Sequence, residues 1–258
     1  MDLIPVNDPS ILSSADWNTF TKIRNWYQTC CIDSFLASHE RIPLSITTQP
    51  YRSRLKLQRL VDLKEKYLGS LIHFLRQILR NHPTIGISYE SIRENFSTLL
   101  TINTSELMRA QVLHELPWEN DRFLFESVLT EPLLQRLERN LLTLRTFLPY
   151  DSLVIKLFLI VLALNSSITP LRRRESYSTN QLQAFPLAFL SVQNYYLTLL
   201  WKYVIYRFGY FEAVMYIARF IQHFLRRQVI EADAIEIVEN REDGGQLLRM
   251  LADLVQRL

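Results

Sequence analysis

The sequence predicts an all-α protein, and two observations carry that prediction. Only 5 of the 258 residues are glycine, which leaves little support for the tight turns of a hairpin-rich β fold. Apolar residues instead recur along the chain at the spacing of a helix face. Because 48% of the residues are hydrophobic, the chain can bury a full core. We expect one domain over residues 14–258, with about ten to eleven helices, after a flexible lead-in over residues 1–13.

Two helices are expected in the first third of the chain. Ser13 or Ser14 can cap the first of them. Its apolar face is formed by Trp17, Phe20, Ile23, Trp26 and Tyr27. After a polar connection over residues 40–50, an unusually long helix is expected over residues 54–81. Pro83 ends it, because the residue before a proline avoids helical backbone angles.

The middle of the chain is harder to divide into elements. Ser88 and Ser91 are both suitable helix caps, and helical sequence continues to about Leu116. We expect a break near residues 103–106, where four polar residues follow one another. Further along, residues 118–128 could hold either a short β-hairpin or a single helical turn.

A proline and an aspartate mark the next two helices. Pro132 lies in the first turn of a helix that reaches Phe147, where a proline is tolerated because first-turn N–H groups need no intrahelical partner. Asp151 caps a strongly apolar helix that ends near Asn165 and contains Lys156. This apolar run is shorter than the about 20 residues that a membrane helix needs, so we expect no membrane segment.

Three helices are expected in the last third of the chain. They cover residues 191–208, residues 211 to about 229 or beyond, and residues 246–258. The arginine-rich stretch before them, residues 166–180, is better explained as a solvated loop than as a nuclear-import signal. Gly209 is expected to turn the chain in the left-handed conformation that a helix end requires. The helix before it has a broad apolar and aromatic face: Val192, Tyr195, Tyr196, Leu199, Leu200, Tyr203 and Tyr206.

Composition and motifs exclude several classes of function. The net charge of +3 comes from interleaved acids and bases, so we expect no direct DNA binding by this chain. Cys30 and Cys31 are neighbours, which rarely bridge each other, and no Cys-x-x-Cys pair is present for a zinc site. The histidines are scattered, and no phosphate loop or nucleophile elbow occurs. We predict no enzyme activity, no cofactor and no metal site.

One segment resembles a known family. Val192 and Gln193, followed by Tyr196, Leu200 and Tyr203, are similar to a late helix of the nuclear-receptor ligand-binding domain. The order of the expected elements over most of the chain is similar too. The resemblance implies a three-layer helical sandwich of a divergent, invertebrate-type receptor without the zinc-finger DNA-binding domain. It also implies transcription regulation in the nucleus, with the cytoplasm as the alternative location.

The resemblance implies a groove for coregulator helices. The family binds short Leu-x-x-Leu-Leu helices between its third, fourth and last helices. Arg80, at the end of the long helix, stands where the family has the cation that binds one end of the peptide, and Arg76 is a substitute. The expected groove residues are Arg76, Arg80, Leu247, Leu248 and Leu251. Because Arg249 replaces the family's glutamate, the final helix could equally well serve only to close the core.

The resemblance also implies a pocket for a small hydrophobic ligand. Arg109 could anchor the polar end of such a ligand, but a buried arginine would need Glu106 or an acidic ligand as its partner. A solvent-facing Arg109 is the alternative. The residues expected near a pocket are Met108, Arg109, Val112, Leu113, Phe123, Phe125, Phe147 and Met215. Packing in the core explains these residues equally well.

Two hypotheses for the function follow. The first is a ligand-binding regulatory module that takes a small hydrophobic ligand, coregulator helices or both. The second is a ligand-independent scaffold that pairs, as a homodimer or heterodimer, through the penultimate long helix. In the family that the chain resembles, this helix forms the dimer seam, and the resemblance implies a seam of Phe211, Tyr216, Phe220 and Phe224.

Overall fold

The described residues are mostly helical. A computed structural model describes residues 12–37, 69–82, 95–112, 130–147, 151–165 and 187–239 of the chain. Within these ranges the structure contains helices and turns but no strand, which confirms the all-α prediction for this part of the chain. Several expectations lie outside the described residues: the lead-in over residues 1–11, the connection over 40–50, residues 54–68 of the long helix, the caps at Ser88 and Ser91, the hairpin or helical turn near 118–128, the loop over 166–180 and the helix over 246–258.

Eight elements have defined bounds. They are α1 (Ser14–Tyr27), the π-helix η1 (Gln28–Asp33), α2 (Ser34–Ala37), α5 (Phe96–Arg109), α7 (Glu131–Phe147), α8 (Ser152–Ala163), α9 (Leu187–Phe208) and α10 (Tyr210–Glu239). A further helical stretch covers residues 69–79. It is followed by a turn at residues 80 and 81, which places the end of the expected long helix where the sequence predicts it.

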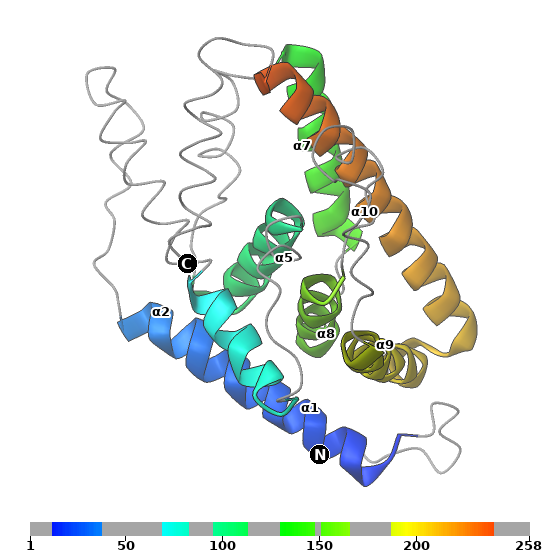
Figure 1. Ribbon diagram of the computed structural model, residues 1–258. Coiled ribbons are helices and arrows are strands. Elements are labelled where there is room, and N and C mark those ends of the chain that lie inside the picture. Colours follow the sequence, from blue (N-terminus) through cyan, green and yellow to red (C-terminus); the bar gives the residue numbers. More distant parts are fainter. Residues whose placement is uncertain are drawn as a thin grey trace.

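The helices lie in three layers (Figure 1). One layer holds α1, η1 and α2 together with the helix over residues 69–79. The middle layer holds α5, α8 and α9, and the third holds α7 and α10. Helix α8 packs against α1, α5 and α9, whereas α10 packs against α7 and α9. Because α8 has neighbours on several sides, nearly all its residues are buried, and its sequence is correspondingly apolar all round.

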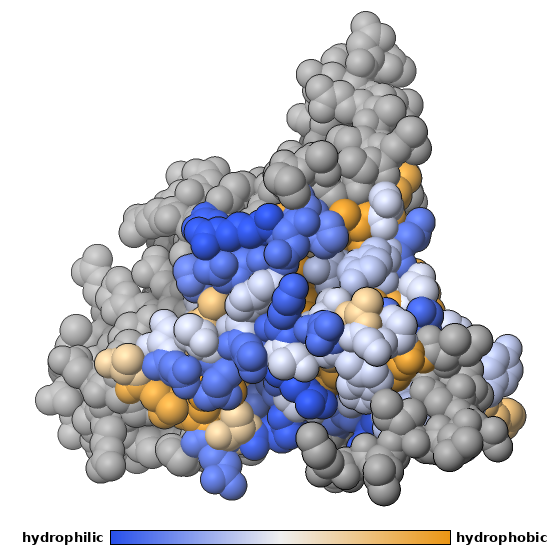
Figure 2. All heavy atoms as spheres, turned by 90° about the horizontal axis from the view of Figure 1, so that it is seen from below, coloured by the Kyte–Doolittle hydropathy of each residue, from blue (hydrophilic) through white to orange (hydrophobic). Residues whose placement is uncertain are grey.

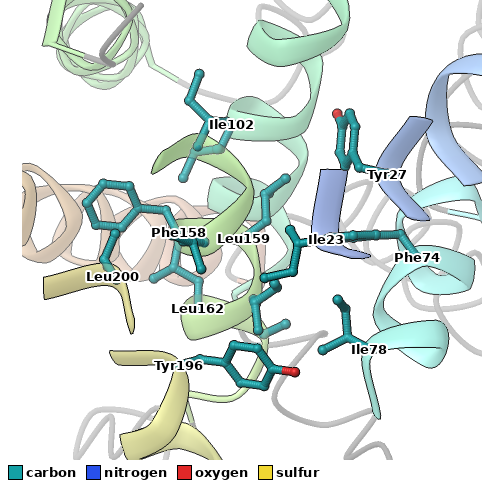
Figure 3. Close-up of a cluster of buried hydrophobic side chains, with 14 of the residues drawn as sticks. Ile23, Tyr27, Phe74, Ile78, Ile102, Phe158, Leu159, Leu162, Tyr196 and Leu200 are labelled. Carbon is teal, nitrogen blue, oxygen red and sulfur yellow. The ribbon is translucent and has the colours of Figure 1, made fainter. Parts of the chain in front are cut away.

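The core surrounds α8. Side chains from α1, the 69–79 helix, α5, α8 and α9 point toward one another in Figure 3. The labelled ones, each no more than 4% exposed, are Ile23, Tyr27, Phe74, Ile78, Ile102, Phe158, Leu159, Leu162, Tyr196 and Leu200. On the face of the molecule seen from below, hydrophobic residues gather only in small groups, which hydrophilic residues separate (Figure 2).

Helix α1 begins with a capping box. The Ser13 hydroxyl accepts a hydrogen bond from the Asp16 amide at 3.2 Å, and the Asp16 carboxylate accepts one from the Ser13 amide at 2.8 Å. Of the two serines that the sequence offers as caps, Ser13 is therefore the one used. The helix passes directly into the π-helical turn η1, in which Cys30 and Cys31 are buried and free of any disulfide. The sequence analysis did not predict this π-helix.

The expected break at residues 103–106 is wrong, because α5 runs through it without interruption. The hydroxyls of Thr104 and Ser105 donate to carbonyl oxygens one turn earlier in the same helix, at 2.6 and 2.9 Å. Helix α5 also ends at Arg109, earlier than the expected Leu116. Gln111 has a φ of 58°, a left-handed conformation that ends the helical hydrogen-bond pattern.

Most of the remaining helix ends agree with the sequence prediction, although α9 begins at Leu187, four residues before the expected start. Pro132 lies in the first turn of α7, and the Asp151 carboxylate caps α8 by accepting from the Leu153 and Val154 amides at 2.9 and 3.4 Å. Gly209 has a φ of 78° and separates α9 from α10. Helix α10 begins one residue before the expected start and reaches Glu239.

Candidate functional site

A buried group of charged side chains joins α5 to α8. Its centre is the carboxylate of Glu106, which is 0% exposed. Arg109 donates to this carboxylate through Nε at 2.8 Å and through a terminal nitrogen at 2.7 Å. Lys156 lies 2.9 Å from the same carboxylate, and Ser152 donates a hydrogen bond to it. We call these four residues the Glu106 cluster.

Helical spacing explains how each half of the Glu106 cluster is built. Glu106 and Arg109 are three residues apart in α5, and Ser152 and Lys156 are four apart in α8, so each pair lies on one face of its helix. The Asp151 cap fixes where α8 begins, and Ser152 is the first helical residue. The close packing of α5 on α8 then brings the two halves together.

Tyr27 extends the Glu106 cluster toward α1. The Lys156 ammonium lies 4.6 Å from the centre of the Tyr27 ring, a distance at which a cation is attracted to the face of an aromatic ring. The Tyr27 hydroxyl donates to the side-chain oxygen of Asn103 at 2.7 Å. The Asn103 amide nitrogen is buried and has no hydrogen-bond partner among the described residues. Side chains from α1, α5 and α8 therefore meet at one polar centre.

The pKa shifts in the Glu106 cluster follow from burial and from charge. Burial alone raises the pKa of Glu106, but the hydrogen bonds from Arg109 and the charge of Lys156 outweigh it, so the pKa lies below its usual value. Burial lowers the pKa of Lys156, and Glu106 only partly offsets that effect. The hydrogen bond to Glu106 raises the pKa of Arg109. Each charged group of the cluster thus has an oppositely charged partner within the chain.

The outcome for Arg109 combines two of the alternatives that the sequence left open. It pairs with Glu106, as a buried arginine would need to, yet its side chain is 37% exposed. Of the other expected pocket residues, Val112 is buried and Met108 is half-buried near the end of α5. Met215 is 37% exposed on α10, so its side chain reaches the surface. Leu113, Phe123 and Phe125, as well as the side chain of Phe147, lie outside the described part of the chain.

The expected groove residues are described only in part. Arg76 and Arg80 are exposed at the end of the 69–79 helix, and Arg80 donates a hydrogen bond to the Gln77 side chain at 3.1 Å. Leu247, Leu248 and Leu251 lie outside the described residues. Whether these five residues form one groove therefore stays a prediction.

The expected dimer seam is divided between two faces of α10. Phe211 is 72% exposed, whereas Phe220 is 5% exposed and its ring stacks on Phe158 with centroids 3.7 Å apart. Tyr216 and Phe224 are partly buried and pack against the core. Only Phe211 of the four presents most of its side chain to solvent. Phe220 lies inside because the packing of α10 on the rest of the chain turns its side chain inward.

Helix α9 contacts its neighbours through polar side chains. The Tyr196 hydroxyl lies 3.3 Å from His82 Nε2, and Tyr203 donates to Asp151 at 3.1 Å. Arg207 donates to the same carboxylate at 2.8 Å. Tyr195 differs from expectation, because it is 41% exposed rather than part of the buried face. These contacts connect α9 to the 69–79 helix and to the start of α8.

Sequence reasoning did not find the Glu106 cluster as a unit. One signal for it was present, because Lys156 interrupts the most apolar run of the chain. A lysine in such a run must find a carboxylate or lose its charge when the helix is buried. Which carboxylate it meets depends on helix packing, since Glu106 lies 50 residues earlier in the chain.

In the part of the chain that the structure describes, no helix is long and apolar enough to cross a membrane. Within the same residues, no group of three or more His, Cys, Asp or Glu side chains could hold a metal ion. Comparisons with protein-family models, with curated proteins and with solved structures found no match.

Proposed function

We propose that this chain is a regulatory domain of the nuclear-receptor ligand-binding type that acts in transcription in the nucleus. The observation that carries the proposal is the position of α9. Val192, Tyr196, Leu200 and Tyr203, four of the residues that resemble the family, are buried on this helix. Helix α9 lies in the middle of three helical layers (Figure 1), an arrangement that supports the proposal. The chain then turns at Gly209 into a long outer helix.

Coregulator binding is supported by the exposed arginines of the 69–79 helix. Arg80 and Arg76 project from the last turns of that helix. A short apolar helix carries partial negative charge at its C-terminus, so a nearby cation stabilises it there. Arg80 is already oriented by its hydrogen bond to Gln77. We therefore propose a Leu-x-x-Leu-Leu helix as a partner.

A small hydrophobic molecule is the proposed ligand. The end of α5 supplies the half-buried Met108 and the partly exposed guanidinium of Arg109, and the turn that follows supplies the buried Val112. Since Glu106 already neutralises Arg109, the ligand needs no acidic group of its own at this position. We propose a largely apolar ligand whose polar end accepts a single hydrogen bond.

The test combines ligand extraction with peptide binding. The purified chain is extracted and bound lipids are identified by mass spectrometry, and a fluorescent Leu-x-x-Leu-Leu peptide is titrated before and after extraction. Arg80→Glu should weaken peptide binding by about tenfold, whereas Arg139→Glu, an exposed arginine on α7, should leave it unchanged. A chain that carries no lipid and binds no peptide under any of these conditions would overturn the proposal.

A specific observation favours the dimerisation scaffold as a second candidate function. Helix α10 exposes several large apolar side chains, among them Phe211, Ile221 and Leu225. Monomeric proteins rarely expose large apolar patches, so such a patch usually marks an interaction surface. Light scattering of the purified chain tests this candidate: a dimer supports the scaffold, and a monomer at all accessible concentrations excludes it.

A further inference from the structure

Asn103 on α5 carries a buried amide whose hydrogen bonds are incomplete. Its side chain is 0% exposed. The side-chain oxygen accepts a hydrogen bond from the Tyr27 hydroxyl at 2.7 Å, but the nitrogen Nδ2 has no hydrogen-bond partner among the described residues. Leaving such a donor unpaired in the core is costly, and folded proteins pair nearly all of their buried polar groups. A further partner is therefore expected at this nitrogen.

The orientation of the Asn103 amide does not remove this deficit. Burial raises the pKa of Tyr27 well above its usual value, so the hydroxyl keeps its proton. The hydroxyl donates that proton to the amide oxygen. Turning the amide by 180° would leave the amide oxygen unpaired and the hydroxyl proton without an acceptor. One end of the amide therefore needs a further partner in either orientation.

Glu106, one turn further along α5, has one oxygen that can take another hydrogen bond. Oε1 accepts from Arg109, Lys156 and Ser152, whereas Oε2 accepts only from Arg109 among the described residues. A carboxylate oxygen has two lone-pair sites, so Oε2 can accept once more. Side chains three residues apart are neighbours on a helix surface. We therefore expect Asn103 Nδ2 and Glu106 Oε2 to lie within reach of one small bridging molecule.

The surroundings of Asn103 favour a small and neutral occupant. The two charges that are buried here, Glu106 and Lys156, cancel each other, and the additional cation Arg109 is 37% exposed and is solvated. A buried anion would therefore lack a compensating charge. Neither Asn103 nor Tyr27 has exposed surface that a larger organic ligand could reach.

We propose that one internal water molecule binds between Asn103 and Glu106. It accepts a hydrogen bond from Asn103 Nδ2 and donates one to Glu106 Oε2. Its second proton goes to the Tyr27 oxygen, which accepts no hydrogen bond from the described residues. Internal waters typically make about three hydrogen bonds to buried polar groups, and these partners supply that number. The water joins α1 to α5 beside the Glu106 cluster, and the proposal does not depend on the receptor function proposed above.

NMR spectroscopy of the full chain tests the water directly. The side-chain N–H protons of Asn103 should show nuclear Overhauser cross-peaks to water, with the sign of a long-lived contact. Asn95 is the matched control, because it is also an asparagine and is 1% exposed. Its Nδ2 donates to the carbonyl oxygens of Leu162 and Asn165 at 3.2 and 2.8 Å, so its N–H protons should show no such cross-peak. The absence of a cross-peak at Asn103 would overturn the proposal.

Two variants show whether the water depends on these side chains. Tyr27→Phe combined with Asn103→Leu removes the hydroxyl and the amide at little cost in shape, and a crystal structure of this double variant should have lost the water. Thr104→Val changes a neighbouring buried residue whose hydroxyl donates only to a carbonyl oxygen of α5, so the water should remain. A water that persists in the double variant would contradict the assigned partners.

A crystal structure of the wild type distinguishes between the possible occupants. Solvent density about 2.9 Å from both Asn103 Nδ2 and Glu106 Oε2 supports a water. Crystals grown in bromide should show no anomalous peak at this position, and such a peak would identify an anion and exclude a neutral occupant. A direct hydrogen bond from Asn103 Nδ2 to a protein atom would rule out the water. Because these outcomes come from the wild type, the test holds even when the double variant does not fold.

Discussion

Glu106 illustrates how a single residue couples three elements. Its carboxylate has no exposed surface and binds Arg109 from its own helix and Lys156 from α8. Lys156 in turn lies over the Tyr27 ring of α1. A buried ion pair contributes little net stability compared with an apolar replacement of the same size. Removing one partner is a different matter, because the other charge then stays buried without compensation.

The first prediction follows from that asymmetry. Glu106→Gln should reduce the free energy of unfolding by about 3–5 kcal/mol, because Lys156 is left buried with no carboxylate. Adding Lys156→Met should recover much of this loss, since it removes the uncompensated cation. Urea denaturation of the two variants measures both values. A single variant that loses less than about 1 kcal/mol would show that the cluster is solvated.

The second prediction concerns how the free energy of unfolding changes at acidic pH. The folded-state pKa of Glu106 lies below the usual 4.5, so the unfolded chain binds its proton more readily. The contribution of Glu106 is therefore fully present above about pH 4.5 and is lost as the pH falls through the lowered pKa. Urea unfolding between pH 6 and pH 3 should show this loss in the wild type. In Glu106→Gln the free energy of unfolding should change less over the same pH range.

The third prediction concerns His82 and a higher pH range. Burial lowers the pKa of His82 from 6.5, so its neutral form is favoured in the folded state. Stability linked to His82 is present above about pH 6.5 and falls as the pH drops through the lowered pKa. His82→Phe should remove this pH dependence of the free energy of unfolding. Tyr196→Phe deletes only the hydroxyl next to His82, so NMR should still show His82 titrating in that variant. An unchanged pH profile in His82→Phe would contradict the prediction.

At the scale of elements, local signals define most helix ends. The Ser13 capping box, Pro132 and the Asp151 cap each lie within a few residues of the backbone groups that they satisfy. Helix α5 behaves differently, because its polar stretch over 103–106 continues as helix. The hydroxyls in this stretch bond within the helix, and Asn103 and Glu106 find partners on α1 and α8. Tertiary contacts therefore override a sequence that favours a break.

The fourth prediction concerns the turn between α9 and α10. A Cβ added at Gly209 would meet nothing within 4 Å, so steric contact with neighbours costs nothing there. The positive φ of 78° remains unfavourable for any residue with a side chain. Gly209→Ala should therefore lower the free energy of unfolding by about 1–2 kcal/mol, and Gly209→Asn should cost less because asparagine tolerates this conformation. Equal losses in both variants would point to another cause.

At the scale of the whole molecule, the packing of the three layers buries one face of α10 and leaves the other face exposed. The inner face carries Phe220 into a stack with Phe158 of α8. The outer face carries Phe211 into solvent. The family resemblance led us to expect both residues on one dimer seam. The packing of α10 against α7 and α9 separates them.

The fifth prediction tests this division. Phe220→Ala should reduce the free energy of unfolding by about 3–5 kcal/mol, because it leaves a cavity beside Phe158. Phe211→Ala should leave the unfolding of the monomer within about 0.5 kcal/mol of the wild type. Both are measured by urea denaturation at a concentration low enough to keep the chain monomeric. Similar losses in the two variants would place both residues in the core.

The sequence by itself determined the all-α class and the positions of most helix ends in the described residues. It could do so because caps, prolines and the left-handed Gly209 act on backbone groups a few residues away. The resemblance of α9 to a receptor helix also came from sequence, and the function that it implies stays a proposal. Only the tertiary structure decided that Glu106 is the partner of Lys156, that residues 103–106 stay helical and that Phe220 lies inside. Those outcomes depend on contacts between residues far apart in the chain, and such contacts exist only once the helices have packed.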